Sequence, residues 1–328
     1  MRRVISLLVA MALVFGVALL SGCNTENPKK DNEKPVIVCS IFPQYDFVRQ
    51  IVGDMAEVIL LQKNGTDMHS FEPTPGNILD ICRADIFVIV DRGAEGWVDG
   101  VLDAANNDDL TLVEMSSFCH LLEEETPESI RGDHGHSHSH DHDHDHGDSC
   151  TVSFDEHMWM SIENVIHTIE GICDTLSREF PENADNFKQN ADEYIENLEA
   201  LDSEFRALDL SGEKFIVADR FPFLYLAQEY NLDYLAAFPG CSDQTHSSFE
   251  VMTYLIGEVK EHNVRVIFKT EDENVHIATQ LSDSTGAEIY TLYSCQSITK
   301  AELDSGETYL SLMRKNLETM KEAYRAVH

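Results

Sequence analysis

Short apolar runs alternate with amphipathic segments through the first half of the chain. Four of these runs have the length of β-strands, at residues 35–41, 57–61, 85–90 and 110–113. Between them the pattern is helical, and Thr74 stands before Pro75, a favoured pair at the start of a helix. Because strands alternate with helices, the pattern predicts βαβ units and a parallel sheet.

The second half begins with a long helical stretch and then returns to alternation. Pro181 ends one predicted helix and opens the next, which would run about 40 Å over 182–208 at ~1.5 Å per residue. Its apolar side chains recur in steps of four and three, as one stripe: Phe187, Ala191, Tyr194, Leu198, Leu201 and Phe205. Four further strands are predicted at 214–218, 233–237, 264–268 and 288–292, with a closing helix over about 307–327.

These patterns predict an α/β protein with two lobes, each a mainly parallel sheet flanked by helices, joined by one long rigid helix. We expect an N-terminal lobe over 35–160, a helical linker over 161–210 and a C-terminal lobe over 211–328. A length of 328 residues agrees with two domains. The stretch 116–153 has almost no periodicity and is too long for an ordinary connection, so it is predicted to be a disordered insertion.

The N-terminus has the pattern of an export signal. Arg2 and Arg3 precede an unbroken apolar run over 4–20. The following Leu-Ser-Gly-Cys resembles a bacterial lipobox, which implies removal of residues 1–22 and lipid attachment to Cys23; an uncleaved membrane anchor is the alternative. Residues 23–34 would then tether an extracytoplasmic protein that is lipid-anchored to the bacterial cell membrane.

The overall charge favours cations as partners. With 23 basic and 59 acidic residues the formal net charge is −36. Nucleic acid and anionic membrane surfaces would be repelled. The acidity also serves solubility outside the cytoplasm, so by itself it does not identify a ligand.

A mid-chain histidine tract adds metal chemistry to this picture. Seven histidines alternate with small or acidic residues: His134, His136, His138, His140, His142, His144 and His146. Imidazole suits zinc, copper, nickel and iron, so the tract is predicted to collect transition metal. A purification tag would be uninterrupted and terminal, and a merely solvated acidic loop is the other alternative.

The cysteines indicate no finger-type or ribbon-type zinc site. Seven remain after Cys23, an odd number that leaves at least one thiol free, and no pair has CxxC spacing. Cys39 and Cys82 lie in apolar segments and are expected to be buried thiols. Cys241 and Cys295 both follow strands of the second lobe, and a disulfide between them is left open.

Two single histidines are candidate metal ligands. His69 lies in a loop between a strand and the helix that Thr74 caps, and open α/β sheets bind ligands at the carboxyl ends of their strands. His157 lies just beyond the histidine tract. Either histidine alone is more often a hydrogen-bonded surface residue than a ligand.

Their surroundings resemble a known family. The motif Gly-x-Asp-x-His-x-Phe-Glu-Pro-Thr-Pro at 65–75 and Asp-x-His-x-Trp at 155–159, with the histidine-rich loop and the lipobox, are similar to the metal-receptor lipoproteins of zinc- and manganese-type ABC transporters. The resemblance covers about 36–323. It implies that one metal ion is held between the two lobes, with His69 and His157 as ligands from the N-terminal side, and that an ABC permease is the partner.

The C-terminal side departs from the family pattern. Arg220 stands where many members have a histidine, and a protonated guanidinium cannot ligate a cation. The late acidic position corresponds to Tyr293, a poor ligand at neutral pH. Asp219, Glu271 and His246 are the remaining candidates, because zinc accepts mixed histidine and carboxylate sets. Asp219 could instead pair with Arg220, Glu271 could cap a helix, and His246 could be an exposed loop residue.

We therefore predict an extracytoplasmic high-affinity Zn²⁺ receptor that delivers metal to an ABC permease and acts as a monomer. A Mn²⁺ receptor of the same class and a permease-independent adhesin or metal buffer are the alternatives; the histidine tract favours zinc. The sequence contains no HExxH, GxSxG or Walker motif, so an enzyme is not expected.

Overall fold

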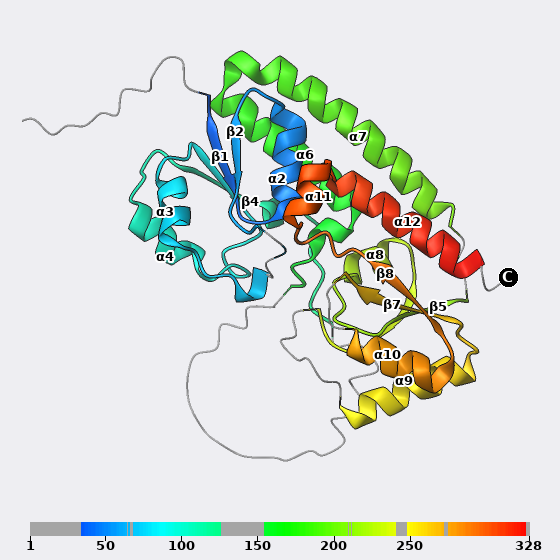
Figure 1. The fold of residues 1–328 in the computed structure, drawn as a ribbon. Coiled ribbons are helices and arrows are strands. Elements are labelled where there is room, and N and C mark those ends of the chain that lie inside the picture. The colour runs from blue at the N-terminus through cyan, green and yellow to red at the C-terminus, as the bar shows by residue number, and fades with distance from the viewer. Residues whose placement is uncertain are drawn as a thin grey trace, which may run out of the picture. The chain divides into compact units, whose positions relative to one another are not determined.

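Two parallel sheets organise the protein in the computed structural model, which describes residues 34–63, 65, 68–125, 154–208, 210, 212–240, 248–271 and 275–325 (Figure 1). The sheets have the strand orders β2-β1-β3-β4 and β6-β5-β7-β8, and each pairing is parallel. The first contains β1 (Val36–Cys39), β2 (Glu57–Leu60), β3 (Ile86–Ile89) and β4 (Thr111–Glu114). The second contains β5 (Lys214–Val217), β6 (Asp233–Ala236), β7 (Val266–Thr270) and β8 (Glu288–Leu292). The predicted α/β fold with two parallel sheets is confirmed.

Helices follow the strands in the order expected for βαβ units. The first lobe has α2 (Phe42–Val52), α3 (Pro75–Cys82) and α4 (Val98–Ala105), with short 3-10 helices η1 (Met68–Ser70), η2 (Met115–Phe118) and η4 (Met158–Met160). The linker consists of α6 (Ile162–Glu179), η5 (Pro181–Asn183) and α7 (Ala184–Arg206). The second lobe has α8 (Leu224–Glu229), α9 (Phe249–Glu261), α10 (His276–Thr285), α11 (Lys300–Ser305) and α12 (Tyr309–Arg325). As predicted, Thr74 caps α3, where its hydroxyl accepts the N–H of Asn77 at 3.3 Å.

Each sheet is covered on both faces, because successive strand residues point to opposite sides. In the first sheet, Val38 and Phe87 belong to a cluster with the helices α3 and α4. The neighbouring residues Ile37 and Val88 belong to a different, larger cluster that includes α2. The second sheet repeats the arrangement, with α9 and α10 on one face and the larger cluster on the other.

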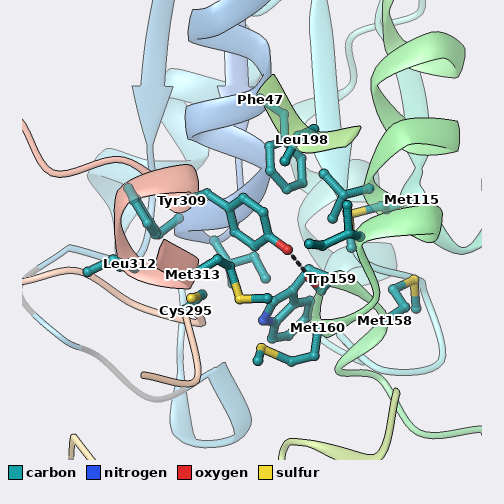
Figure 2. Packing of buried hydrophobic residues seen from close by; sticks show 14 of the residues in the cluster. Phe47, Met115, Met158, Trp159, Met160, Leu198, Cys295, Tyr309, Leu312 and Met313 are labelled. Atoms are coloured by element: carbon teal, nitrogen blue, oxygen red, sulfur yellow. Dashed lines mark hydrogen bonds between the residues drawn. The ribbon is translucent and has the colours of Figure 1, made fainter. Parts of the chain in front are cut away.

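The larger cluster is continuous across both lobes and explains why they form one compact unit from Pro35 onward. Near its centre the ring of Phe47 meets Tyr309 edge-on, at 5.0 Å between centroids. The Tyr309 hydroxyl donates a hydrogen bond to the backbone oxygen of Trp159 at 2.6 Å (Figure 2). Six methionines are buried in the same cluster: Met68, Met115, Met158, Met160, Met313 and Met320.

The long helix α7 packs against α2, α6 and α12 along its length (Figure 1). All six residues of the predicted stripe are buried, from Phe187 to Phe205. The helix ends at Arg206, within the predicted range. The long helix is therefore confirmed, and its apolar face is the reason for its place in the core.

Several predicted boundaries are corrected. The insertion does not begin at residue 116, because η2 extends to Phe118 and Glu123 pairs with Phe154 in an antiparallel bridge. The third strand of the second lobe begins at Val266 rather than 264, and the short helix α11, which precedes the predicted closing helix, was not predicted. Within the residues described, no helix is long and apolar enough to span a membrane.

Candidate metal centre

The candidate site lies where strands of both sheets end. His69 is part of η1, after β2, and His157 directly precedes η4. On the other side, Asp219 and Arg220 follow β5, Gly240 follows β6, Glu271 follows β7 and Ser294 follows β8. The carboxyl ends of parallel strands are the usual ligand-binding edge of open α/β sheets.

The two predicted histidines lie beside each other. The centroids of the His69 and His157 rings are 6.0 Å apart and the ring planes form an angle of 58°. Two imidazoles bound to one tetrahedral zinc, with Zn–N bonds of about 2.0–2.1 Å, have centroids roughly 5 Å apart. The rings therefore need only a small adjustment to share one ion.

A carboxylate contacts the Nδ1 atom of each ring. Glu156 Oε1 lies 2.9 Å from Nδ1 of His69, and Asp155 Oδ1 lies 3.1 Å from Nδ1 of His157. Asp155 Oδ1 also accepts the backbone N–H of His157, at 2.9 Å. A carboxylate on one ring nitrogen fixes the tautomer and makes the other nitrogen, Nε2, the better metal ligand.

Sequence reasoning had given Asp155 and Glu156 no role of their own. The sequence feature that could have revealed them is their position directly before His157, from which a carboxylate can reach an imidazole ring. The site is also shielded from water: His157 is 1% exposed and Asp155 2%. Electrostatic interactions are stronger in such surroundings than in bulk water.

The segment that carries His157 is held by the second lobe. The Tyr225 hydroxyl donates to the backbone oxygen of Asp155 at 2.6 Å, and Trp159 Nε1 donates to the backbone oxygen of Ser294 at 2.8 Å. Gly240 approaches closely: a Cβ atom added there would lie 3.0 Å from the Phe221 oxygen and 3.3 Å from Cε1 of His157. Only glycine allows this approach without displacement.

A cavity of about 40 Å³ lies against His157. Most of its lining comes from the second lobe: Gly65, His157, Arg220, Pro222, Gly240, Thr270, Glu271, Ser294, Gln296 and Ser297. His157 is the only one of the two histidines in this lining, and the second-lobe part of the wall combines one guanidinium, one carboxylate and several hydroxyl or amide groups.

The two candidate carboxylates of this wall differ in position. Glu271 lines the cavity, and its two oxygens accept hydrogen bonds from the hydroxyl and the N–H of Ser294, at 2.7 and 2.9 Å. Asp219 Oδ2 accepts the Thr270 hydroxyl at 2.6 Å, and its Oδ1 accepts the N–H of Arg220 at 2.8 Å. Asp219 therefore braces the loop after β5 rather than lining the cavity. The capping alternative for Glu271 is wrong, because α10 begins at His276 with Val275 as its N-cap.

Other predicted residues have different outcomes. Within the described part of the chain, no group of three His, Cys, Asp or Glu side chains is arranged to hold a metal. His246, the histidine tract at 134–146 and Cys23 lie outside the described residues. Cys295 is a fully buried free thiol, whereas Cys241, with which a disulfide was left open, lies outside the described residues. Cys39 is a buried free thiol, as predicted, whereas Cys82 is only half-buried.

A buried carboxyl group lies behind the first lobe's side of the site. Glu95 follows β3, is 1% exposed, and accepts hydrogen bonds at Oε2 from the Val90 N–H (2.6 Å) and the Ser40 hydroxyl (3.1 Å). Burial and, to a smaller extent, the negative charges of Glu156 and Asp91 raise the pKa of Glu95 from 4.5 to about 7, against the lowering effect of the two hydrogen bonds. The carboxyl group is thus half-protonated near neutral pH.

Known proteins of similar sequence and fold bind zinc. The zinc-binding lipoprotein AdcA of Streptococcus pneumoniae is 31% identical over 98% of this chain, which spans 61% of that relative's length. The high-affinity zinc uptake system protein ZnuA of Bacillus subtilis is 29% identical over 93% of both chains. The crystal structure of the Zn(II)-bound ZnuA-like domain of S. pneumoniae AdcA matches with a TM-score of 0.70 and 29% identity, over 88% of this chain and 98% of that one.

The family comparison agrees with the resemblance inferred from the two histidine motifs. The family model described as "Zinc-uptake complex component A periplasmic" matches residues 37–323, which include both lobes and the linker. A transport component also agrees with the prediction of a binding protein rather than an enzyme. On this match, the chain belongs to the zinc-uptake complex component A family.

Proposed function

We propose that this protein is an extracytoplasmic receptor that binds one Zn²⁺ tightly and delivers it to an ABC permease. The observation that carries the proposal is the pair His69 and His157, whose rings lie 6.0 Å apart with a carboxylate on each Nδ1. Glu271, on the opposite wall of the cavity, is the proposed third ligand. Asp219 and His246 stay predictions for a further contribution.

Zinc as cargo is supported by the donor set. Neutral imidazole suits zinc, whereas Mn²⁺ favours sites rich in carboxylate and water, and zinc stands above manganese in general affinity. With two imidazoles and one carboxylate the protein would supply three donors, in the range that zinc accepts. Mn²⁺ should therefore compete weakly for the same site.

The tight site is tested by zinc competition against a chromophoric chelator, using protein that begins at Asn24 and is purified without added metal. We expect one tight site per chain. Loss of a residue that only orients a metal ligand can lower metal affinity by roughly 100-fold. His69→Ala and His157→Ala each remove a proposed ligand, so each should lower the zinc affinity of the site by at least that factor. His262→Ala, which removes a half-exposed histidine at the end of α9, is the matched control. Unchanged zinc affinity in both site variants would refute the proposal.

The two carboxylates behind the rings give a second arm of this experiment. Glu156→Gln and Asp155→Asn remove the charges on Nδ1 but keep a similar shape. Each should lower zinc affinity by about 10–100-fold. If neither does, the carboxylates hold the segment in place without tuning the imidazoles.

The histidine tract is proposed to collect metal by weak, rapidly exchanging coordination. Deletion of residues 134–146 should lower the total zinc bound at saturation, as measured by elemental analysis, and leave one tight site. Loss of the tight site on deletion would contradict this division of labour.

Delivery to a permease and lipid anchoring through Cys23 are proposed from the family and the lipobox. Zinc uptake by proteoliposomes that contain a permease and ATPase of this transporter class from the same organism should require this protein. Labelled palmitate should enter the wild-type protein but not a Cys23→Ala variant. Uptake that is independent of the receptor would instead favour a metal buffer.

A further inference from the structure

We propose that Trp159 and Ser294 form a rigid link between His157 and Glu271, and that this link restricts the metal site to a small four-coordinate ion. The inference rests on the proposed function, because Glu271 is the proposed third ligand. Trp159 and Ser294 are positioning residues in this proposal, since they act through the two ligands that they hold.

The indole of Trp159 contacts a ligand on one side and the second lobe on the other. Its ring meets the ring of His157 at 5.4 Å between centroids, with 63° between the planes. Its Nε1 donates a hydrogen bond of 2.8 Å to the backbone oxygen of Ser294. Trp159 is 1% exposed, and its backbone oxygen accepts the hydroxyl of Tyr309 (Figure 2). The indole therefore cannot turn or withdraw without breaking these contacts.

Ser294 extends the link to the proposed third ligand. Its backbone N–H donates to Oε2 of Glu271 at 2.9 Å, and its hydroxyl donates to Oε1 of the same carboxylate at 2.7 Å. Two hydrogen bonds from one residue fix the plane of the carboxylate, as outer-shell partners do for metal ligands in general. The position of Glu271 is thereby tied to that of Ser294.

The loop that carries Ser294 is itself held on both sides. The fully buried side chain of Asn316, on α12, accepts the N–H of Tyr293 at 2.7 Å and donates to the backbone oxygen of Tyr293 at 2.8 Å. On the other side, Cys295 has a φ of 57°, in the left-handed region that residues with a side chain rarely adopt. Such a conformation persists only where the surroundings impose it, and it is frequent at ligand sites.

A fixed separation between His157 and Glu271 favours zinc over manganese. Zinc completes a tetrahedral site with two imidazoles, one carboxylate and one further ligand. Manganese favours six ligands, so it would need three more beyond these protein donors. The cavity that both residues line has a volume of about 40 Å³, which roughly three water molecules would fill without the ion. A larger coordination shell would therefore require the two ligands to move apart, which the link prevents.

Two variants of the soluble chain from Asn24 each break one part of the link. Trp159→Phe removes the Nε1 hydrogen bond and keeps an aromatic ring beside His157. Ser294→Ala removes the hydroxyl bond to Glu271 and keeps the backbone bonds. Zinc affinity is measured by chelator competition, and manganese affinity by the electron paramagnetic resonance signal of the free ion. In each variant we expect zinc affinity to fall by about 10–100-fold while manganese affinity stays nearly unchanged.

Matched controls remove similar groups elsewhere. Ser311→Ala removes a hydroxyl that donates to a carboxylate oxygen of Glu307 at 2.7 Å, at the start of α12. Trp97→Phe removes an indole whose Nε1 has no hydrogen-bond partner in the part of the chain that the structure describes. Both controls should keep the zinc and manganese affinities of the wild type. All affinities are measured at a temperature at which urea unfolding shows each variant to be fully folded.

Co²⁺ in place of zinc reports the coordination number directly. The wild type should show the strong visible absorption of four-coordinate Co²⁺. In Trp159→Phe and Ser294→Ala this absorption should weaken toward that of six-coordinate Co²⁺, because the ligands can move apart. A change in stability alone would not alter the spectrum of the folded, loaded protein.

The outcomes separate this inference from the proposed function. Zinc and manganese affinities that fall by the same factor, or that do not change, would overturn the link and leave the receptor intact. An effect of Ser294→Ala without an effect of Trp159→Phe would overturn the role of Trp159. Absence of a tight zinc site in the wild type would overturn the receptor itself.

Discussion

The buried carboxyl of Glu95 should make the protein less stable as the pH rises through neutrality. In the unfolded chain this group titrates near 4.5, whereas in the folded protein its pKa is raised to about 7, chiefly by burial. Between these values the unfolded chain releases the proton while the folded protein keeps it, so increasing pH favours unfolding. At about 1.4 kcal/mol per pH unit, the difference corresponds to a loss of about 3 kcal/mol that is complete above pH 7.

Glu95→Gln isolates this effect. The amide oxygen can still accept the hydrogen bonds of Val90 and Ser40, so the variant should match the wild type near pH 4.5. Its stability advantage should then grow between pH 5 and 7, to about 3 kcal/mol at pH 8. Urea unfolding of the metal-free protein in chelator, followed at several pH values, measures the difference. Glu261→Gln, at an exposed position on α9, is the control.

A difference between Glu95→Gln and wild type that stays flat from pH 5 to 8 would refute the reasoning. So would a difference that falls with increasing pH, because it would mean that the folded protein favours the ionised carboxylate.

Three further substitutions have defined outcomes. Phe187→Ala empties a fully buried position on α7 and should lower the free energy of unfolding by about 3–5 kcal/mol in urea titration. Gly240→Ala places a methyl group about 3.3 Å from the His157 ring and 3.0 Å from the Phe221 backbone oxygen, so it should weaken zinc binding in chelator competition and also lower the urea midpoint. Trp159→Phe removes the hydrogen bond to the Ser294 oxygen and should lower the free energy of unfolding by about 1–3 kcal/mol; an unchanged midpoint would show that this bond contributes nothing.

The fold could be predicted from sequence because its signals are local. Strand-length apolar runs and the stripe from Phe187 to Phe205 are buried as expected, since each follows the period of its own element. Boundaries were less predictable. Residues 116–125 have no period of their own and are ordered by distant partners, such as the bridge between Glu123 and Phe154.

The candidate site divides in the same way. His69 and His157 could be paired because their motifs are local and distinctive, and the structure brings the two rings together. The roles of Asp219 and Glu271 depend on Thr270 and Ser294, which are 51 and 23 residues away in the sequence. Sequence periodicity does not indicate contacts between residues so far apart, so the roles of these second-lobe residues could be found only from the structure.

Residues 154–160 have two roles. They include His157, and they connect the lobes through hydrogen bonds that involve Tyr225, Trp159 and Ser294. A docking protein that pulled the second sheet away would break those connections and release the segment that holds His157 in place. Metal binding and the association of the two lobes would then be governed by one equilibrium. Such a receptor needs no separate latch, and its unloading can be driven simply by a surface that prefers the separated lobes.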